Sequence, residues 1–206
     1  QFEVDLQGGQ KTGHYCDQRD NRLWLRALCE GKSVLDTFCY SGGFAMNAVK
    51  GGAERVTAVD SSQPALALAA ANAARNGCEG AIEFVHSDVQ DFLGECVREK
   101  RTFDIVVLDP PKLAPSRKDL ERAKGRYRKL NKAALQCVAP GGLLITCTCS
   151  SAMAQTSELL GVVRAAASEC SRQVTVVRTS GAACDHPVSP SFPEGTYLQA
   201  YGVAMS

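Results

Sequence analysis

Short apolar runs alternate with longer amphipathic stretches through most of this chain of 206 residues. The short runs are rich in Val, Ile, Leu and Phe and have the length of strands, whereas apolar positions three and four residues apart in the longer stretches indicate helices. The predicted strands are Ser33 to Cys39, Arg55 to Asp60, Ile82 to Asp88, Phe103 to Pro110, Gly142 to Ser150, Gln173 to Ser180 and Tyr197 to Met205. The predicted helices are Phe44 to Lys50, Pro64 to Asn76, Val89 to Lys100, Arg117 to Val138 and Gln155 to Cys170.

This alternation predicts an α/β fold. Strands separated by helices of this size need right-handed crossover connections, which produce a mainly parallel sheet with helices on both faces. The segment Ser180 to Gly195 contains three prolines and is predicted to be a long loop before the last strand. The length fits one well-cored domain.

Composition excludes some partners and leaves others open. A net charge of +1 gives no basic field over the whole chain. Lysines and arginines nevertheless gather in one segment, where a solvated helix face and a contact with nucleic acid are equally good interpretations. These cations are Lys112, Arg117, Lys118, Arg122, Lys124, Arg126, Arg128, Lys129 and Lys132.

The ten cysteines do not indicate a disulfide scaffold, because they lie within strand and helix patterns of a chain much larger than the domains that need such bridges. We expect most of them to be reduced and buried. The chain has three histidines and no Cys-x-x-Cys pair, so no metal site is expected. No apolar run approaches the ~18 residues of a membrane span. We therefore expect a soluble, intracellular protein and, because the sequence starts at Gln1, a piece of a longer one.

The ends of the first three strands carry the residues expected to bind a cofactor. Asp36 is followed by a turn with the glycine pair Gly42 and Gly43, which lets a ligand approach backbone amides. The turn lacks the Gly-Lys-Ser/Thr of a P-loop, which disfavours a nucleoside triphosphate. A carboxylate at Asp60 can accept both ribose hydroxyls of an adenosine, and Asp88 can reach the adenine or simply cap a helix. The full predicted set is Asp36, Phe38, Ser41, Gly42, Gly43, Asp60, Ser61, Asp88, Val89 and Asp109.

The next two strand ends carry candidate catalytic groups. One strand ends in Asp109-Pro110-Pro111-Lys112, and the following strand ends in Thr148-Cys149-Ser150. Neighbouring parallel strands would bring this carboxylate and this thiol to the same edge of the sheet, where α/β enzymes carry out their chemistry. A buried structural role for Cys149 remains an alternative. Cys147 lies on the same strand face, two residues deeper.

These motifs are similar to those of class I S-adenosylmethionine-dependent methyltransferases, and the resemblance covers essentially the whole chain. It is carried by Val34 to Gly43, Val56 to Asp60, Asp104 to Lys112 and Gly141 to Ser150. Gly9 to Arg22, Asp185 to Pro187 and Phe192 to Tyr197 narrow it to the bacterial large-subunit ribosomal RNA cytosine-C5 methyltransferase family of the RlmI type. The resemblance implies a Rossmann-like, seven-stranded sheet with an antiparallel last strand, S-adenosylmethionine as cofactor, and a cytosine of ribosomal RNA as substrate.

The resemblance also implies roles for segments outside the sheet. Residues 1–30 would pack on the cofactor pocket of a methyltransferase domain formed by residues 31–206, and Gln18 and Arg19 would contact the methionine end of the cofactor, with a structural ion-pair cluster as the alternative. Proteins of this type carry a PUA RNA-binding domain before the catalytic domain, so we expect weak RNA affinity from this chain alone. The expected substrate contacts are Pro110, Pro111, Lys112 and His186.

Methylation at C5 gives a chemical reason for the cysteine, because C5 of cytosine is a poor nucleophile. A thiolate at Cys149 that adds to C6 makes C5 reactive, and Asp109 would bind the N3 and N4 edge of the ring. A base must then remove the C5 proton, and Asp109 or water are candidates. Some RNA cytosine-C5 methyltransferases have a second cysteine after the proline, where this chain has Pro111 and Lys112, so a mechanism with one cysteine is implied.

Three other functions stay open at this point. Asp-Pro-Pro motifs also occur in enzymes that methylate base nitrogens of guanine or adenine and need no thiol. A relative that binds RNA without catalysis, and a Rossmann oxidoreductase, would share parts of the pattern. The expected partner is RNA, with no membrane and no metal. The oligomeric state is open, a homodimer included. The expected location is the cytoplasm, or an organelle if a transit peptide precedes this sequence.

Overall fold

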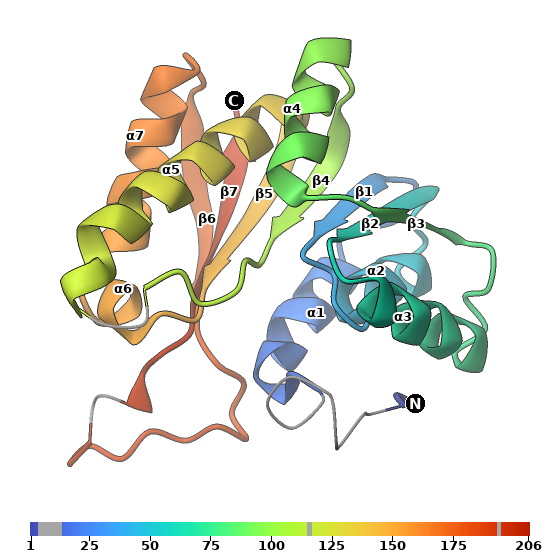
Figure 1. Ribbon diagram of the computed structural model, residues 1–206, viewed down its shortest axis with the longest axis horizontal. Helices are drawn as coiled ribbons and strands as arrows, with labels where there is room; N and C mark the ends of the chain where they lie inside the picture. The colour runs from blue at the N-terminus through green and yellow to red at the C-terminus, as the bar shows by residue number, and fades with distance from the viewer. Residues whose placement is uncertain (4–13, 115–116, 193–194) are drawn as a thin grey trace.

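The computed structural model describes residues 1–3, 14–114, 117–192 and 195–206. Seven strands form one sheet in the order β3-β2-β1-β4-β5-β7-β6 (Figure 1). The α/β fold and the number of strands are as the sequence predicts. The strands are β1 Ser33–Thr37, β2 Arg55–Asp60, β3 Ile82–His86, β4 Phe103–Leu108, β5 Val138–Thr148, β6 Val174–Ser180 and β7 Gln199–Met205.

The first five strands run parallel, and β7 is antiparallel to both of its neighbours, β5 and β6. The antiparallel last strand that the resemblance implies is therefore confirmed. Because the order reverses beside β1, the carboxyl ends of β1 and β4 lie next to each other at the switch point where α/β sheets bind ligands.

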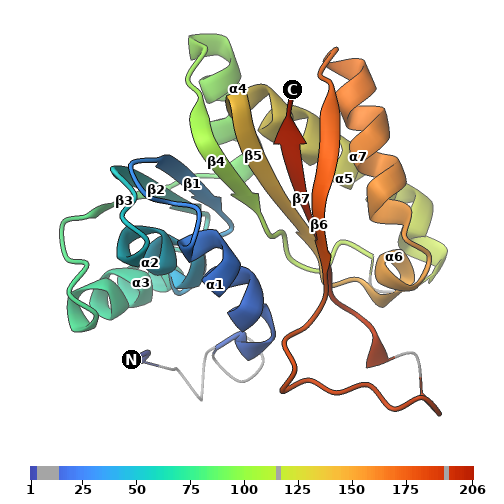
Figure 2. The same ribbon diagram turned by 180° about the vertical axis from the view of Figure 1, so that it is seen from behind.

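Helices cover both faces of the sheet. Figure 1 shows α4, α5 and α7 on one face, and Figure 2 shows α1, α2 and α3 from the other side. The connection between β6 and β7 and the segment before α1 extend from the same end of the molecule (Figures 1 and 2). The helical elements are the 3-10 turns η1 Cys16–Gln18 and η2 Arg117–Asp119, and the helices α1 Arg19–Arg26, α2 Gly43–Lys50, α3 Gln63–Arg75, α4 Val89–Glu99, α5 Leu120–Cys137, α6 Ser151–Gln155 and α7 Glu158–Glu169.

Alternation along the central strands divides the core into two apolar clusters, one on each face. Leu35, Val106 and Leu144 belong to the cluster beneath α4, α5 and α7. Their sequence neighbours Val34, Ile105 and Ile145 belong to the cluster beneath α1, α2 and α3. Full burial of a Val, Leu or Ile side chain contributes roughly 1.5–3 kcal/mol, so both faces of the sheet stabilise the fold.

The structure differs from the sequence prediction at α1 and at β5. Helix α1, with buried Asn21 and Leu25 on one face, lies in a segment for which no helix was predicted. Strand β5 begins at Val138 rather than Gly142, because the pairing with β4 shifts register there and Gly141 adopts a positive φ of 72°. The early part of β5 pairs only through this irregularity, which hydrophobic periodicity does not reveal.

The cysteines of the described structure are free thiols, as the sequence predicts. None of the ten cysteines, all within the described residues, forms a disulfide, and six are buried. Among the described helices none has the length and apolar character to cross a membrane. The described residues contain no group of three or more His, Cys, Asp or Glu side chains suited to a metal ion.

Candidate active site

Four side chains that the sequence singles out lie on one face of the sheet, at the carboxyl ends of β1, β2, β4 and β5. They follow the alternation of the buried residues Val34, Ala58, Val107 and Cys147, all in the cluster beneath α1, α2 and α3. Because side chains two residues apart share a face, Asp36, Asp60, Asp109 and Cys149 also lie toward these helices. Strand order and alternation together thus produce one candidate site.

Asp36 lies deepest in this group. It pairs in register with Ala58 and Val107, two positions before Asp60 and Asp109, and is only 1% exposed. Its Oδ2 accepts a hydrogen bond of 2.9 Å from the Ala45 amide, whereas Oδ1 has no partner among the described residues. Burial, reinforced by the charge of Asp109, raises the pKa of Asp36 to about 7. The unsatisfied Oδ1 atom can accept a hydrogen bond from a ligand.

The turn after β1 brings its backbone to the end of β2. Phe38, Tyr40 and Gly42 have positive φ angles of 57°, 47° and 78°, a conformation that non-glycine residues rarely adopt and that often marks binding sites. The Asp60 carboxylate holds this turn through a 2.9 Å bond from the Tyr40 amide, while its other oxygen accepts from the Ser62 amide. Each carboxylate oxygen has a second lone pair, so Asp60 can still accept hydroxyl groups of a ligand.

Gly43 at the start of α2 lies against the side chain of Arg22 from α1. A Cβ atom at Gly43 would lie 2.7 Å from both Cζ and Nε of Arg22. The same guanidinium lies 5.5 Å from the centre of the Phe44 ring. Burial lowers the pKa of Arg22, while the charges of Asp109 and Asp36 act in the opposite direction. A partly buried cation therefore lies between the glycine turn and the two carboxylates.

His14 also contacts the guanidinium of Arg22. The two side chains approach to 3.2 Å between Arg22 Nη1 and His14 Nε2. Burial and the positive charge of Arg22 lower the pKa of His14 to about 4. A neutral imidazole at neutral pH lets Nε2 accept the hydrogen bond from Arg22.

The other residues predicted to bind the cofactor are placed as follows. Asp88 caps α4, with Oδ1 accepting from the amides of Gln90 at 2.7 Å and Asp91 at 3.2 Å, so the capping role considered for it is present. Ser41 is buried in the β1 turn, Val89 is buried at the start of α4, and the carbonyl of Ser61 lies 3.0 Å from His86 Nε2.

Gln18 and Arg19, adjacent in sequence, point to different places. Gln18 is 2% exposed and lies beside Cys147, where its amide lowers the thiol pKa that burial raises. Arg19 is exposed and forms ion pairs with Asp20 at 3.0 Å and Asp185 at 2.7 Å. The ion-pair alternative for this segment is therefore seen at Arg19, and contacts of Gln18 and Arg19 with the cofactor stay predictions.

A buried hydroxyl network ties the loop that carries Asp109 to the loop that carries Cys149. The Tyr127 hydroxyl lies 2.8 Å from Thr148 Oγ1, which also accepts from the Ser150 amide at 3.2 Å. Ser150 Oγ in turn accepts from the Ala114 amide at 3.2 Å. These bonds fix the ends of β4 and β5 relative to each other, which a reaction between a thiol and a held substrate requires.

Two tyrosines from distant parts of the chain lie near the same thiol. Burial and the neighbouring Tyr40, together with the charges of Cys149 and Asp109, raise the pKa of Tyr15 to about 12. Burial and a hydrogen bond to Asp17 raise the pKa of Tyr197, with a further contribution from Cys149. A cavity of about 440 Å³ is lined by His14, Tyr15, Cys16, Asp17, Asp185, His186 and Tyr197. Its volume falls in the range of small-ligand sites.

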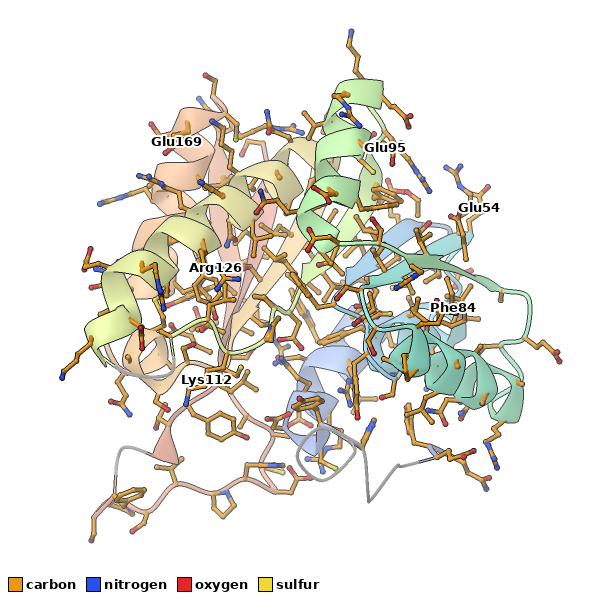
Figure 3. The ribbon with its side chains drawn as sticks, viewed as in Figure 1. Glu54, Phe84, Glu95, Lys112, Arg126 and Glu169 are labelled. Atoms are coloured by element: carbon orange, nitrogen blue, oxygen red, sulfur yellow. The ribbon has the colours of Figure 1, made fainter. Side chains whose placement is uncertain are left out.

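The residues predicted to contact the substrate differ in their exposure and in whether they line the cavity. Pro110 is buried, whereas Pro111 and Lys112 are exposed. Figure 3 shows Lys112 at the end of the sheet from which the connection between β6 and β7 extends. His186 lines the cavity and its Nδ1 lies 2.8 Å from Asp185 Oδ1.

Most of the described cations on α5 are held by acidic partners. Lys124 pairs with Glu121 and Glu158 at 2.9 Å, and Arg128 and Lys132 both pair with Glu169 of α7 at 3.3 Å. Arg126 on α5 and Glu169 on α7 are labelled in Figure 3. These pairs favour the solvated-face interpretation of the segment over a dedicated nucleic-acid surface.

The sequence prediction did not assign Arg22, Asp17, Tyr15 or Tyr197 to the site. All four occur in motifs that carried the family resemblance, Gly9 to Arg22 and Phe192 to Tyr197. Clustering of polar and aromatic residues outside any strand was the available signal, but it does not identify the partner of each side chain. Residues 9–13 and 193–194 of these motifs, with Lys11 among them, lie outside the described residues.

Known proteins similar to this chain are methyltransferases. A family model described as S-adenosylmethionine-dependent methyltransferase matches residues 1–179. A ribosomal RNA large subunit methyltransferase I from Aeromonas hydrophila is 44% identical over 197 residues, which are 95% of this chain and 49% of that protein. The chain spans about half the length of the curated relatives it matches.

Two solved structures share the fold over 98% of this chain. A protein from Streptococcus mutans described as a SAM-dependent methyltransferase has a TM-score of 0.86 and 26% identity, covering 98% of this chain and 52% of that one. A methyltransferase structure in complex with SAH has a TM-score of 0.83 and 26% identity, covering 98% of this chain and 53% of that one. The family match favours a methyltransferase over the oxidoreductase considered from the sequence.

Proposed function

The chain belongs to the family of S-adenosylmethionine-dependent methyltransferases, and we propose that it methylates C5 of a cytosine in large-subunit ribosomal RNA through a covalent bond from Cys149 to C6. The observation that carries this proposal is the placement of Cys149 and Asp109 on one sheet face at adjacent strand ends, tied together by the Tyr127 network. The relatives are named as ribosomal RNA methyltransferases, which supports RNA as substrate. Their bacterial origin supports a cytoplasmic location.

The residues at the ends of β1 and β2 fit the cofactor. Asp36 has an unsatisfied, buried oxygen, and the Gly42-Gly43 turn leaves backbone accessible where a side chain would clash. We assign the ribose hydroxyls to Asp60, the adenine side to Asp88, and the methionine carboxylate to the guanidinium of Arg22 rather than that of Arg19. When bound, S-adenosylmethionine supplies an electrophilic methyl group.

Cys149 and Asp109 have different roles toward the cytosine base. The Cys149 thiolate adds to C6, so electron density moves to C5, which becomes the nucleophile. Asp109 accepts a hydrogen bond from the N4 amino group and stabilises the ring protonated at N3 while the thiolate adds. Pro110 and Pro111 fix the backbone after Asp109, and Lys112 faces the RNA backbone from the exposed side of this loop.

A covalent trap tests this function. The full-length protein is incubated with S-adenosylmethionine and ribosomal RNA that contains 5-fluorocytidine, and protein–RNA adducts are measured by mass spectrometry. Fluorine at C5 blocks elimination after methyl transfer, so wild type should accumulate an adduct and Cys149→Ala should not. The matched control is Cys170→Ala, which changes a partly buried cysteine at the C-terminal end of α7 and should trap like wild type.

The opposite result would replace the proposal. Methylated RNA without any adduct, together with an active Cys149→Ala variant, would show that the thiol is structural. Methylation of a base nitrogen, which requires no thiol, would then explain the Asp-Pro-Pro motif. Absence of both methylation and cofactor binding would instead favour a relative that binds RNA without catalysis.

A further inference from the structure

The hydroxyl of Tyr197 and the carboxylate of Asp17 form a pair that the methylation mechanism above leaves unused. Tyr197, just before β7, donates a 2.7 Å hydrogen bond to Asp17 Oδ2 across 180 residues of sequence. The Asp17 carbonyl accepts a second bond, of 2.8 Å, from the Ala183 amide at the start of the same connection. Asp17 is therefore held from two points of the segment between β6 and β7.

The pair lines a cavity and lies within electrostatic reach of the Cys149 thiol. Both residues line the 440 Å³ cavity, and the charge of Cys149 acts on the Tyr197 phenol. Asp17 is only 6% exposed, and its Oδ1 atom has no hydrogen-bond partner among the described residues. A buried carboxylate oxygen without a partner can accept a hydrogen bond from a ligand.

The proposed reaction requires a base at a defined place. After transfer, C5 carries both the new methyl group and its original proton, and the two lie on opposite faces of the ring. The base must therefore lie on the face away from the methyl donor. The cavity that Tyr197 and Asp17 line does not include the Gly42-Gly43 turn. Asp109 is occupied at the N3 and N4 edge.

We propose that Tyr197 removes the C5 proton and passes its own phenolic proton to Asp17 in the same step. This inference rests on the proposed function. The C5–H bond breaks and its electrons form the C5–C6 double bond, while the C6–S bond breaks and its electrons return to Cys149 as a thiolate. The C5 proton bonds to Tyr197 Oη, and the phenolic proton moves along the existing hydrogen bond to Asp17 Oδ2. Asp17 then releases this proton to water.

The electrostatics explain why two residues are needed. Because burial and the Asp17 hydrogen bond raise the pKa of Tyr197, the phenol stays protonated at neutral pH. A protonated phenol becomes a base only when an acceptor takes its proton at the same time. Asp17 is that acceptor, and acts on the substrate through Tyr197.

The test uses the full-length protein with ordinary ribosomal RNA and S-adenosylmethionine. Tyr197→Phe and Asp17→Asn should still add the thiol and transfer the methyl group but should fail to eliminate. A methylated, covalent protein–RNA complex should then accumulate at least about tenfold above wild type, while released 5-methylcytosine falls. The control is Tyr201→Phe, which removes the hydroxyl of a buried tyrosine on β7 outside the cavity and should behave like wild type.

Each outcome decides the proposal. Loss of product without a trapped complex in Tyr197→Phe would assign the pair a structural role, and wild-type turnover would show that it is not needed; either result overturns the inference. Tyr197→Phe removes a single oxygen, so it decides the question even if Asp17→Asn does not fold. If wild type itself produces no 5-methylcytosine and no adduct with 5-fluorocytidine, the proposed function fails instead.

Discussion

The two halves of the candidate site are built in different ways. In the cofactor half, at the ends of β1 and β2, short stretches of sequence supply the groups, and carboxylates bind backbone amides, as Asp36 does with Ala45 and Asp60 with Tyr40. In the substrate half, side chains bind side chains across the chain, as Tyr197 does with Asp17 over 180 residues.

This difference determines what each half depends on. A strand followed by a glycine turn positions its carboxylate by local geometry, so the cofactor half depends on backbone conformation. The substrate half depends on the whole fold, because the segments that meet there come from both ends of the chain. Substitutions should therefore affect the halves separately, and the following experiments test that separation.

Cys149→Ala should produce the largest split between the halves. We expect methyl transfer to RNA to fall by about 1,000-fold or more, because the covalent route is removed, while affinity for S-adenosylmethionine stays within about twofold. Radioactive methyl transfer and calorimetry measure the two quantities. A parallel loss of cofactor affinity would show that the two halves act as one unit.

Gly43→Ala should act mainly on the cofactor half. The added Cβ would lie 2.7 Å from the Arg22 guanidinium, so Arg22 must move. We expect the free energy of unfolding to fall by roughly 1–3 kcal/mol and cofactor affinity to fall by about tenfold. The control is Gly94→Ala in α4, where nothing lies within 4 Å and stability should rise by a few tenths to about 1 kcal/mol. Equal thermal shifts in both variants would contradict the close contact.

Arg22→Met and Arg19→Met compare two arginines three residues apart. The first removes the cation beside Gly43, and we expect about a tenfold loss of cofactor affinity. The second removes an exposed partner of Asp185, and we expect affinity within about twofold of wild type. Calorimetry with S-adenosylmethionine measures both. A larger loss at Arg19 would restore the contact that the family resemblance implies.

Asp36→Asn should separate stability from binding. With a pKa of about 7 in the folded protein, against 3.8 unfolded, Asp36 binds more protons when folded and makes stability fall as pH rises from about 4 to 7. The variant should lose this slope and gain roughly 1–2 kcal/mol at pH 8, while cofactor affinity decreases. Urea unfolding at several pH values measures the slope. An unchanged pH profile would mean that Asp36 is ionised in the folded state.

His14 should give the smallest effect, at the boundary between the halves. Its pKa of about 4 in the folded protein lies below the unfolded value of 6.5, so its contribution is present above pH 6.5 and is lost as pH falls toward 4. For a partly exposed ring we expect at most about 1 kcal/mol over this range. His14→Gln, which keeps an acceptor for Arg22, should flatten stability between pH 6.5 and 4 in the same unfolding experiment.

The sequence predicted most of the secondary structure and the strand-end chemistry. Asp36, Asp60, Asp109 and Cys149 could be selected because a strand end followed by a turn is a local pattern, and alternation then assigns the face. The roles of these four residues stay predictions, as do those of Asp88, Ser61, Lys112 and His186 and the division at residue 30. Helix α1 could not be predicted, because contact with α2 and β7 stabilises it, as where Trp24 packs on Gly202.

Hydrophobic periodicity, glycine turns and acidic strand ends thus determined the fold class and the residues proposed for the cofactor half, since each acts within a few residues of chain. Only the tertiary structure decided which arginine lies beside Gly43, how β5 shifts its pairing with β4, and that Tyr197 meets Asp17. These contacts join segments distant in sequence. Their partners are selected by packing of the complete sheet and its helices, which no local pattern specifies.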